Sequence, residues 1–229
     1  MKLAIMQPYL FPYIGYFQLM NYVDTYVVYD DVQFTKGGWI NRNYINLNNN
    51  RFLLTLPIEK PSLKKKINDI NVVGYFKKYL KTIVQAYRPA RYFNDVYPML
   101  ESIFVRQDRD LVGLILDSFY AICSYLDCHV DIIVSSDLNM ATELKGAPRI
   151  LAMCNALNAH DYVNAIGGQC LYSKDEFLKN NINLQFLMTH DIEYEQFSGS
   201  FIPNLSIIDV LMFNSKQDVK RFLTQFDLV

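Results

Sequence analysis

The sequence has few histidines and cysteines, a balanced charge and no long apolar run. Lys and Arg number 22 against 23 Asp and Glu, so the formal net charge of the 229 residues is −1, and no long basic block stands out. Proteins whose main partner is duplex nucleic acid usually carry a basic patch or stripe. The charge balance therefore argues against duplex nucleic acid as a main partner.

The cysteines and histidines are too scattered for a metal site. Zinc ligands usually come as closely spaced cysteine pairs or as histidines four residues apart on a helix, and neither pattern occurs here. The residues concerned are Cys123, Cys128, Cys154, Cys170, His129, His160 and His190. A chain of this size does not need a disulfide framework. We expect no metal ligands and reduced cysteines, as in a cytoplasmic protein.

Targeting and membrane signals are missing as well. The N-terminal run MKLAIM is broken by Gln7 and Pro8, so it is too short for the core of a signal peptide. No run approaches the ~18 apolar residues that a transmembrane helix needs. We expect a cytoplasmic protein without a transmembrane segment, and peripheral membrane contact and a homo-oligomer remain open alternatives.

The beginning of the chain predicts a βαβ unit. Residues 2–6 form an apolar run typical of a buried strand, residues 14–23 fit a short helix, and residues 25–29 are a β-branched and aromatic run. Such a unit predicts a parallel sheet with a ligand crevice at the carboxyl ends of its strands. The length and the hydrophobic content of 51% predict one α/β domain over residues 1–229.

The rest of the chain adds a hairpin and then mostly helices. Two apolar runs at 44–47 and 52–56 flank an Asn-rich turn, and the lysine-rich segment 59–71 is expected to be an exposed loop, so about 41–71 forms a hairpin and lid-like insertion. Helices are expected at 73–87, 95–125 with a break near 107–108, 145–157, 175–180, 206–213 and 216–226, and strands at 129–134, 161–164 and 183–188. The fold class is α/β: a Rossmann-like parallel-sheet core that starts with a βαβ unit, with a β-hairpin insertion and a helical C-terminal half.

Aromatic residues are abundant, with 17 Tyr and 15 Phe, and the stretch MQPYLFPYIGYF at 6–17 combines them with two prolines and a glycine. Coding bias accounts for part of this abundance. Pro8 and Pro12 fix φ and remove amide donors, and Gly15 lets the chain turn into its helix. The loop either stiffens the end of the first strand or also lines a pocket through Gln7 and Tyr16.

Polar residues follow the second strand. Asp30, Asp31 and Gln33 stand where a parallel sheet presents residues to its crevice. Because adjacent side chains on an extended backbone point to opposite sides, we expect one of the two aspartates to enter a site. The alternative is a solvated turn.

The densest polar cluster spans 36–43. Lys36 and Arg42 could bind phosphate, Arg42 with its planar fork, and Trp39 could stack on a base or a sugar ring. Asn41 and Asn43 add two carboxamides. The glycine pair in this stretch lacks the spacing of a dinucleotide fingerprint or a Walker loop. Ligand binding is favoured over a simple polar turn.

A second glycine pair, Gly167 and Gly168, follows a short strand, so its backbone could approach a ligand closely. Cys170 stands next to it and offers a nucleophile. A packing role is favoured, because cysteine is among the most buried residue types and the chain has no protease-like order of cysteine and histidine. No Gly-x-Ser-x-Gly elbow offers a serine instead.

The helix expected at 206–213 begins with Ser206, at a place where free amides can bind an anion. Asp209 lies on this helix among apolar residues. A buried aspartate needs a partner, and we expect Lys145 or Arg149 to supply it.

Together these motifs resemble the WbqC-like family nearly from end to end. The residues that carry the resemblance are Gln7-Pro8, Gly15–Phe17, Asp30–Phe34, Trp39 with Asn41–Asn43, Gly167-Gly168, Tyr194 with Gln196, and Leu205–Asp209. Members of this family are typically encoded among bacterial genes for O-antigen and other surface polysaccharides. Many relatives carry His immediately before the Gln-Pro pair, where this chain has Met6, so an acid–base role of that histidine does not carry over.

The resemblance implies a role in building or decorating an unusual sugar. Because sugar pathways of this type often need an acyl or aminoacyl group, such as glycyl, on the amine of a nucleotide-linked amino sugar, we expect a transferase for that reaction. We expect Asp30, Asp31 and Asn43 to be the catalytic groups and a nucleotide-linked sugar to be the partner. The expected substrate-binding residues are Gln7, Tyr16, Gln33, Lys36, Trp39, Asn41, Arg42, Gly167, Gly168, Gln196 and Ser206. The cofactor is unknown, with ATP and an activated acyl donor as the candidates.

Two alternatives stay open. An ATP-dependent nucleotidyl transferase or ligase shares the βαβ start by fold analogy, but the loop after the first strand lacks the His-x-Gly-His motif of those enzymes. A non-catalytic nucleotide-sugar-binding protein of the assembly pathway would use the same pocket without turnover.

Overall fold

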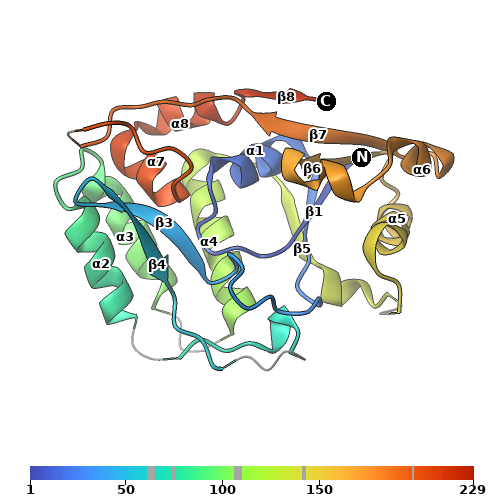
Figure 1. The fold of residues 1–229 in the computed structure, drawn as a ribbon, viewed down its shortest axis with the longest axis horizontal. Coiled ribbons are helices and arrows are strands. Elements are labelled where there is room, and N and C mark those ends of the chain that lie inside the picture. The colour runs from blue at the N-terminus through green and yellow to red at the C-terminus, as the bar shows by residue number, and fades with distance from the viewer. Residues whose placement is uncertain (61–64, 74–75, 106–109, 141–142, 198) are drawn as a thin grey trace.

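The computed structural model describes residues 1–60, 65–73, 76–105, 110–140, 143–197 and 199–229. Figure 1 shows a central sheet with helices around it and a separate hairpin to one side. Within the described ranges, no helix combines the length and the apolar character needed to cross a membrane.

The central sheet has six strands in the order β5-β2-β1-β6-β7-β8. All neighbouring strands are parallel except β7 and β8, which are antiparallel. The strands are β1 (Lys2–Met6), β2 (Thr25–Val28), β5 (Asp131–Val134), β6 (Asp161–Ala165), β7 (Asn183–Thr189) and β8 (Phe226–Leu228). In this Rossmann-like order the chain winds first to one side of β1 and then to the other. The predicted parallel core with a βαβ start is confirmed, and α1 (Ile14–Tyr22) is its helix.

Alternating side chains on the central strands divide the core into two layers. Leu3 and Ile5 of β1 pack on one face of the sheet, and Ala4 packs on the other, as the two-residue period of a strand requires. The first face is covered by α5 (Gly146–Ala156) and α6 (Lys174–Lys179), and the second by α1, α4 (Leu111–Leu126), α7 (Ile207–Phe213) and α8 (Lys216–Phe222).

The predicted hairpin is confirmed and forms a sheet of its own from β3 (Arg42–Leu47) and β4 (Asn50–Thr55). Asn48 and Asn49 make its turn with φ of 54° and 57°, the left-handed values that such tight turns need and that Asn tolerates. The hairpin packs on α2 (Lys77–Tyr87), where the backbone N–H of Asn46 donates to the Tyr87 hydroxyl at 3.0 Å.

Two predictions of local structure are wrong. The segment 59–71 was expected to be an exposed loop, but its described part contains the short helix η1 (Ile67–Asp69), and Ile67 and Ile70 are fully buried. Residues 61–64 lie outside the described residues. The last helix ends at Phe222, four residues earlier than expected, because Phe226 begins β8. The span 95–125 holds α3 (Phe93–Ile103) and α4, and the predicted break at 107–108 lies outside the described residues.

Candidate functional site

β1 and β6 diverge toward their carboxyl ends. The register between β1 and β2 runs from Leu3 to Met6, whereas the register between β1 and β6 holds two pairs, at Lys2 and Leu3. β1 and β6 are also the two strands between which the direction of winding reverses. In open α/β sheets this switch point is where ligands bind, because the loops on either side turn away from each other.

A cavity of about 660 Å³ opens at this switch point, and we call it the first cavity. The loop after β1 contributes Gln7 to its wall, and the short helix η3 (Ile166–Leu171) that follows β6 contributes Gly167. Five aromatic side chains line it: Tyr9, Tyr13, Tyr16, Trp39 and Tyr44. Its described lining includes the cation Arg51 and no carboxylate. The size and the mixture of aromatic and polar groups are those of a small-molecule site.

The loop after β1 is held in a strained shape. Phe11 is buried and has φ of 46°, in the left-handed region that residues other than glycine rarely adopt. Its carbonyl accepts hydrogen bonds from Asn43 Nδ2 at 2.6 Å and from Ser206 Oγ at 2.8 Å. Asn43 and Ser206, both predicted site residues, therefore hold the cavity wall in place, and Asn43 also lines the cavity.

Gly15 allows the ring of Tyr13 to lie against the start of α1. A Cβ atom on Gly15 would come within 2.5 Å of that ring, so any other residue would displace it. The hydroxyl of Tyr16 is 3.5 Å from the backbone carbonyl of Gln7, to which it donates. These contacts give the glycine and the tyrosines of the opening loop a common role, which is to shape one wall of the first cavity.

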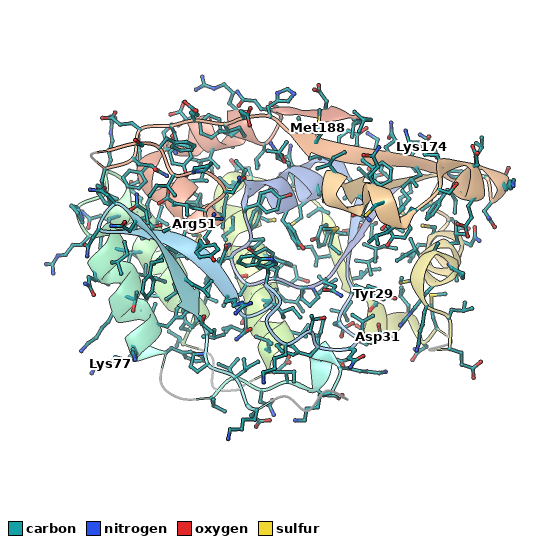
Figure 2. All side chains as sticks on the ribbon, viewed as in Figure 1. Tyr29, Asp31, Arg51, Lys77, Lys174 and Met188 are labelled. Carbon is teal, nitrogen blue, oxygen red and sulfur yellow. The ribbon has the colours of Figure 1, made fainter. Side chains whose placement is uncertain are left out.

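The two arginines near the hairpin have different surroundings. Arg42 bonds the carbonyls of Gly37 and Gly38 in its own loop, with 2.8 Å between Nε and the Gly38 oxygen. Arg51 lines the first cavity, and its guanidinium lies 4.1 Å from the centre of the Tyr44 ring. Figure 2 shows Arg51 beside the hairpin. Arg51 forms no ion pair with any described residue, so its charge is available to a ligand.

The other residues of the 36–43 cluster have different positions relative to the first cavity. Trp39 lines the first cavity and is 46% exposed, so part of its indole ring is free for contact. Asn41 is buried and donates through Nδ2 to the carbonyl of Leu56 at 2.7 Å, which ties the two ends of the hairpin together. Lys36 is exposed and is not part of the cavity lining.

Asp30 and Asp31 lie in a buried hydrogen-bond network and are not among the residues that line the first cavity. Asp31 accepts from Ser135 Oγ at 2.6 Å and from the guanidinium of Arg149. Burial raises the pKa of Asp31, but these hydrogen bonds outweigh burial, so its pKa lies below the usual range. Asp30 accepts from the backbone N–H and the hydroxyl of Ser136, at 3.0 and 2.7 Å. Figure 2 shows Asp31 on the side of α5.

Asp209 is fully buried, but the prediction that Lys145 or Arg149 pairs with it is wrong, because Arg149 pairs with Asp31. Its carboxylate accepts instead from three neutral groups: the Tyr87 hydroxyl at 2.8 Å, the Tyr194 hydroxyl at 2.7 Å and Gln196 Nε2 at 2.7 Å. Burial raises the pKa of Asp209, and the three hydrogen bonds oppose that rise. Gln196 thus contacts a buried acid rather than the first cavity.

The two glycines of the second pair have different roles. Gly167 lines the first cavity, whereas a Cβ atom on Gly168 would come 2.9 Å from Asn164 Nδ2, so Gly168 permits close packing under the loop. Cys170 is exposed, so the packing role expected for it is wrong, and it is not part of the cavity lining. Gln33 is exposed, and its backbone pairs with that of Lys66.

A second cavity of about 650 Å³ adjoins the first. Tyr13, Thr189 and Asn204 line both cavities and form the partition between them. Asp191 and Glu193 line the second cavity. The first cavity therefore holds the cation of Arg51, and the second holds these two carboxylates together with His190, which contacts the carboxylate of Asp227 at 3.1 Å.

The tyrosines of the first cavity are hydrogen-bond donors rather than bases. Burial is the main reason that the pKa of Tyr9 and the pKa of Tyr16 lie above the ordinary value. Their hydroxyls therefore stay protonated at neutral pH. The Tyr16 hydroxyl donates to the carbonyl of Gln7, and the Tyr9 hydroxyl can donate to an oxygen of a ligand. Among the described residues, no three His, Cys, Asp or Glu side chains are grouped as metal ligands would be.

Sequence reasoning missed Arg51, Tyr44 and Thr189 as lining residues. Arg51 lies opposite Asn46 in the hairpin, and Tyr44 is two residues from Asn46, so the alternation of a strand places Arg51 and Tyr44 on one face. Thr189 is the last residue of β7 and stands at the carboxyl edge of the sheet. Asp30 was selected because residues at the carboxyl ends of parallel strands face the ligand crevice, and the same reasoning selects Thr189.

The matches to known proteins cover nearly the whole chain. The model of the WbqC-like protein family matches residues 7–221. The uncharacterized protein Rv1507c of Mycobacterium tuberculosis is 28% identical over 227 residues, which cover 97% of each chain. No solved structure matches the chain. Because the family model covers residues 7–221, nearly the whole chain, we conclude that the chain belongs to the WbqC-like protein family.

Proposed function

We propose that this protein is a transferase of bacterial surface polysaccharide (O-antigen and lipopolysaccharide) biosynthesis. It acts in the cytoplasm and moves an acyl or aminoacyl group, such as glycyl, onto the amine of a nucleotide-linked amino sugar. The observation that supports this most is the first cavity, where Arg51 and five aromatic side chains surround a space at the switch point of the sheet. A diphosphate would find a cation there, and a base or sugar ring would find aromatic faces.

In this proposal, some residues contact the ligand from the wall of the first cavity, and others hold that wall in place. Gln7, Tyr16, Trp39 and Gly167 contact the nucleotide-linked sugar from the wall. Further substrate-binding residues of the family motifs act by holding that wall: Asn41, Arg42, Gly168 and Ser206. Gln196 instead holds the segment before α7, because its Oε1 accepts from the backbone N–H of Ile202 at 2.9 Å. Lys36 and Gln33, both exposed, are assigned to the approach of the anionic ligand.

The chemical step is attack of a neutral amine on an activated carbonyl carbon. The carbon–nitrogen bond forms, the bond to the leaving group breaks with its electron pair, and one amine proton passes to the leaving group. The protonated hydroxyl of Tyr9 is a suitable donor to the oxyanion that develops. The hydroxyl of Tyr16 donates to the carbonyl of Gln7 and so helps to shape the wall. Asn43 positions the wall beside them.

Asp30 and Asp31 receive a positioning role. A carboxylate with a lowered pKa is a weak base, and Asp31 already accepts from Arg149 and Ser135. Through these hydrogen bonds the two aspartates fix the end of β2, from which the chain continues into the cavity wall at Thr35.

Mass spectrometry tests the reaction. The protein is incubated with UDP- and dTDP-linked amino sugars and with acyl and aminoacyl thioesters, with and without ATP. A mass gain on the sugar without ATP is the expected result. A requirement for ATP with release of AMP would favour a ligase instead, and saturable binding without any mass gain would favour a non-catalytic binding protein.

A matched pair of arginine variants tests the location of the site. Arg51→Ala removes the cation of the first cavity and is expected to weaken nucleotide-sugar binding about 10- to 100-fold, the range of one or two charge-assisted hydrogen bonds. Arg91 also lies over a tyrosine ring, that of Tyr92 at 5.5 Å, but it is not part of the cavity lining. Arg91→Ala should leave the Kd unchanged in calorimetric titration. Equal effects of the two variants would place the ligand elsewhere.

A further inference from the structure

The partition between the two cavities contains a side chain whose hydrogen-bonding direction is fixed. Thr189 is half-buried at the end of β7 and lines both cavities. Its hydroxyl lies 2.7 Å from Oε1 of Gln18, a residue of α1 that is fully buried. A hydroxyl can donate once and accept twice, so its partners decide what it offers to a ligand.

The neighbours of Gln18 determine which end of its amide faces Thr189. The backbone carbonyls of Phe222 and Gln225 lie 2.8 and 3.0 Å from one end of the amide. Carbonyls only accept, so this end must be the NH₂ group and the other end must be the oxygen. The Gln18 oxygen can only accept as well, and Thr189 must therefore donate its single proton to Gln18.

With its proton committed to Gln18, the Thr189 hydroxyl is a pure acceptor toward the cavities. A threonine oxygen has two lone pairs. They are the groups that Thr189 can offer to a hydrogen-bond donor of a ligand at the junction of the cavities.

We propose that Thr189 Oγ1 binds and orients the acceptor amine of the nucleotide-linked sugar, and that Gln18 is the positioning residue that fixes Thr189 as an acceptor. This inference rests on the proposed function. An amine that donates one N–H to a fixed oxygen has its lone pair confined to a narrow range of directions, which favours attack on a carbonyl held nearby. A sugar without an N–H or O–H at this point would offer no donor to the lone pairs of this oxygen.

The charges of the two cavities favour the same orientation of the ligand, with its diphosphate in the first cavity and its amine toward the second. Arg51 lies in the first cavity, where it attracts the diphosphate. Asp191 and Glu193 line the second cavity, and neither forms an ion pair with a described residue. Their field favours an amine, or the ammonium from which it forms, on the far side of the diphosphate. Thr189 stands between the two groups of charges.

The test measures whether the Thr189 hydroxyl and the ligand amine recognise each other. Binding is measured by calorimetry for two matched pairs of ligands: UDP-glucosamine with UDP-2-deoxyglucose, and a dTDP-4-amino-4,6-dideoxyhexose with its 4-deoxy counterpart. The protein variants are wild type, Thr189→Val, which keeps the shape without the oxygen, and Thr189→Ser, which keeps the oxygen. Circular dichroism confirms that each variant is folded, and Thr189→Ala replaces Thr189→Val if the latter does not fold.

Wild type is expected to bind the amine-bearing member of at least one pair about tenfold more tightly, the value of one hydrogen bond to a charged or strongly polar group. Thr189→Val should lose this preference with less than a twofold change for the ligand without the amine, and Thr189→Ser should retain it. A preference that survives in Thr189→Val, or that wild type never shows, overturns the inference while nucleotide-sugar binding stands. If no nucleotide sugar binds to wild type, the proposed function itself fails, and this inference fails with it.

Discussion

The carbonyl of Phe11 has two side-chain donors, and this leads to a quantitative prediction. Asn43 Nδ2 and Ser206 Oγ both donate to it from buried positions. With either donor gone, the carbonyl keeps one partner. With both gone, a carbonyl buried in the wall of the first cavity has no side-chain partner left, so the double variant should be less stable than the sum of the single variants predicts.

The magnitude follows from ordinary hydrogen-bond energies. Asn43→Ala and Ser206→Ala should each lower the free energy of unfolding by about 1–2 kcal/mol. The double variant should lose about 1–3 kcal/mol more than their sum, the penalty for a buried polar group without a partner. For a chain of this size, each kcal/mol corresponds to roughly 2–4 °C in Tm.

Urea denaturation of the four proteins measures this coupling. Ser118 gives a matched control, because its hydroxyl is equally buried and donates to the carbonyl of Ile115 at 2.6 Å, which Asn43 does not contact. Asn43→Ala combined with Ser118→Ala should be additive within about 0.5 kcal/mol. Additivity of the Asn43 and Ser206 variants would refute the reasoning, since the shared carbonyl would then not be what couples them.

Three further predictions concern the surroundings of the site. Gly15→Ala places a Cβ atom where the Tyr13 ring lies and should weaken nucleotide-sugar binding in calorimetric titration; an unchanged Kd would contradict the role given to that ring. Arg149→Met leaves Asp31 as a buried charge without its ion-pair partner and should cost about 3–5 kcal/mol in urea denaturation, part of which Asp31→Asn in the same chain should restore. Burial raises the folded-state pKa of Asp209 above its unfolded value, so the free energy of unfolding should fall as the pH rises from about 4 through the raised pKa and then level off. Asp209→Asn should remove this pH dependence. If that variant shows the same slope, Asp209 is not its source.

The sequence was sufficient to predict the elements that depend on local pattern. The βαβ start follows from an apolar run, a helical stretch and a β-branched run, and the hairpin follows from its Asn-rich turn, so both could be read directly. β8 could not be predicted in this way. Phe226–Leu228 is short, and its strand conformation depends on pairing with β7, which lies far from it in the sequence.

The site was harder to predict because side-chain partners come from distant positions. The motif residues Asp30, Asn43 and Ser206 were selected as site residues, but nothing in the sequence indicates that Ser136 would bond Asp30 or that Phe11 would be the partner of the other two. Lys36 and Arg42 were selected from the sequence for a phosphate, and Arg51 was not selected. The hydrogen bonds between Arg42 and the glycine carbonyls, and the contact between Arg51 and the Tyr44 ring, become visible only in the folded structure.

The bonds at Phe11 also bear on the order in which the protein folds. Asn43 is 32 residues from Phe11 in the sequence, and Ser206 is 195 residues away. Closing such a long loop is entropically costly and must precede the contact that rewards it. During synthesis the opening loop leaves the ribosome early, yet its final shape has to wait for α7, near the other end of the chain. The part of the protein that is translated first should therefore be among the last to reach its native form.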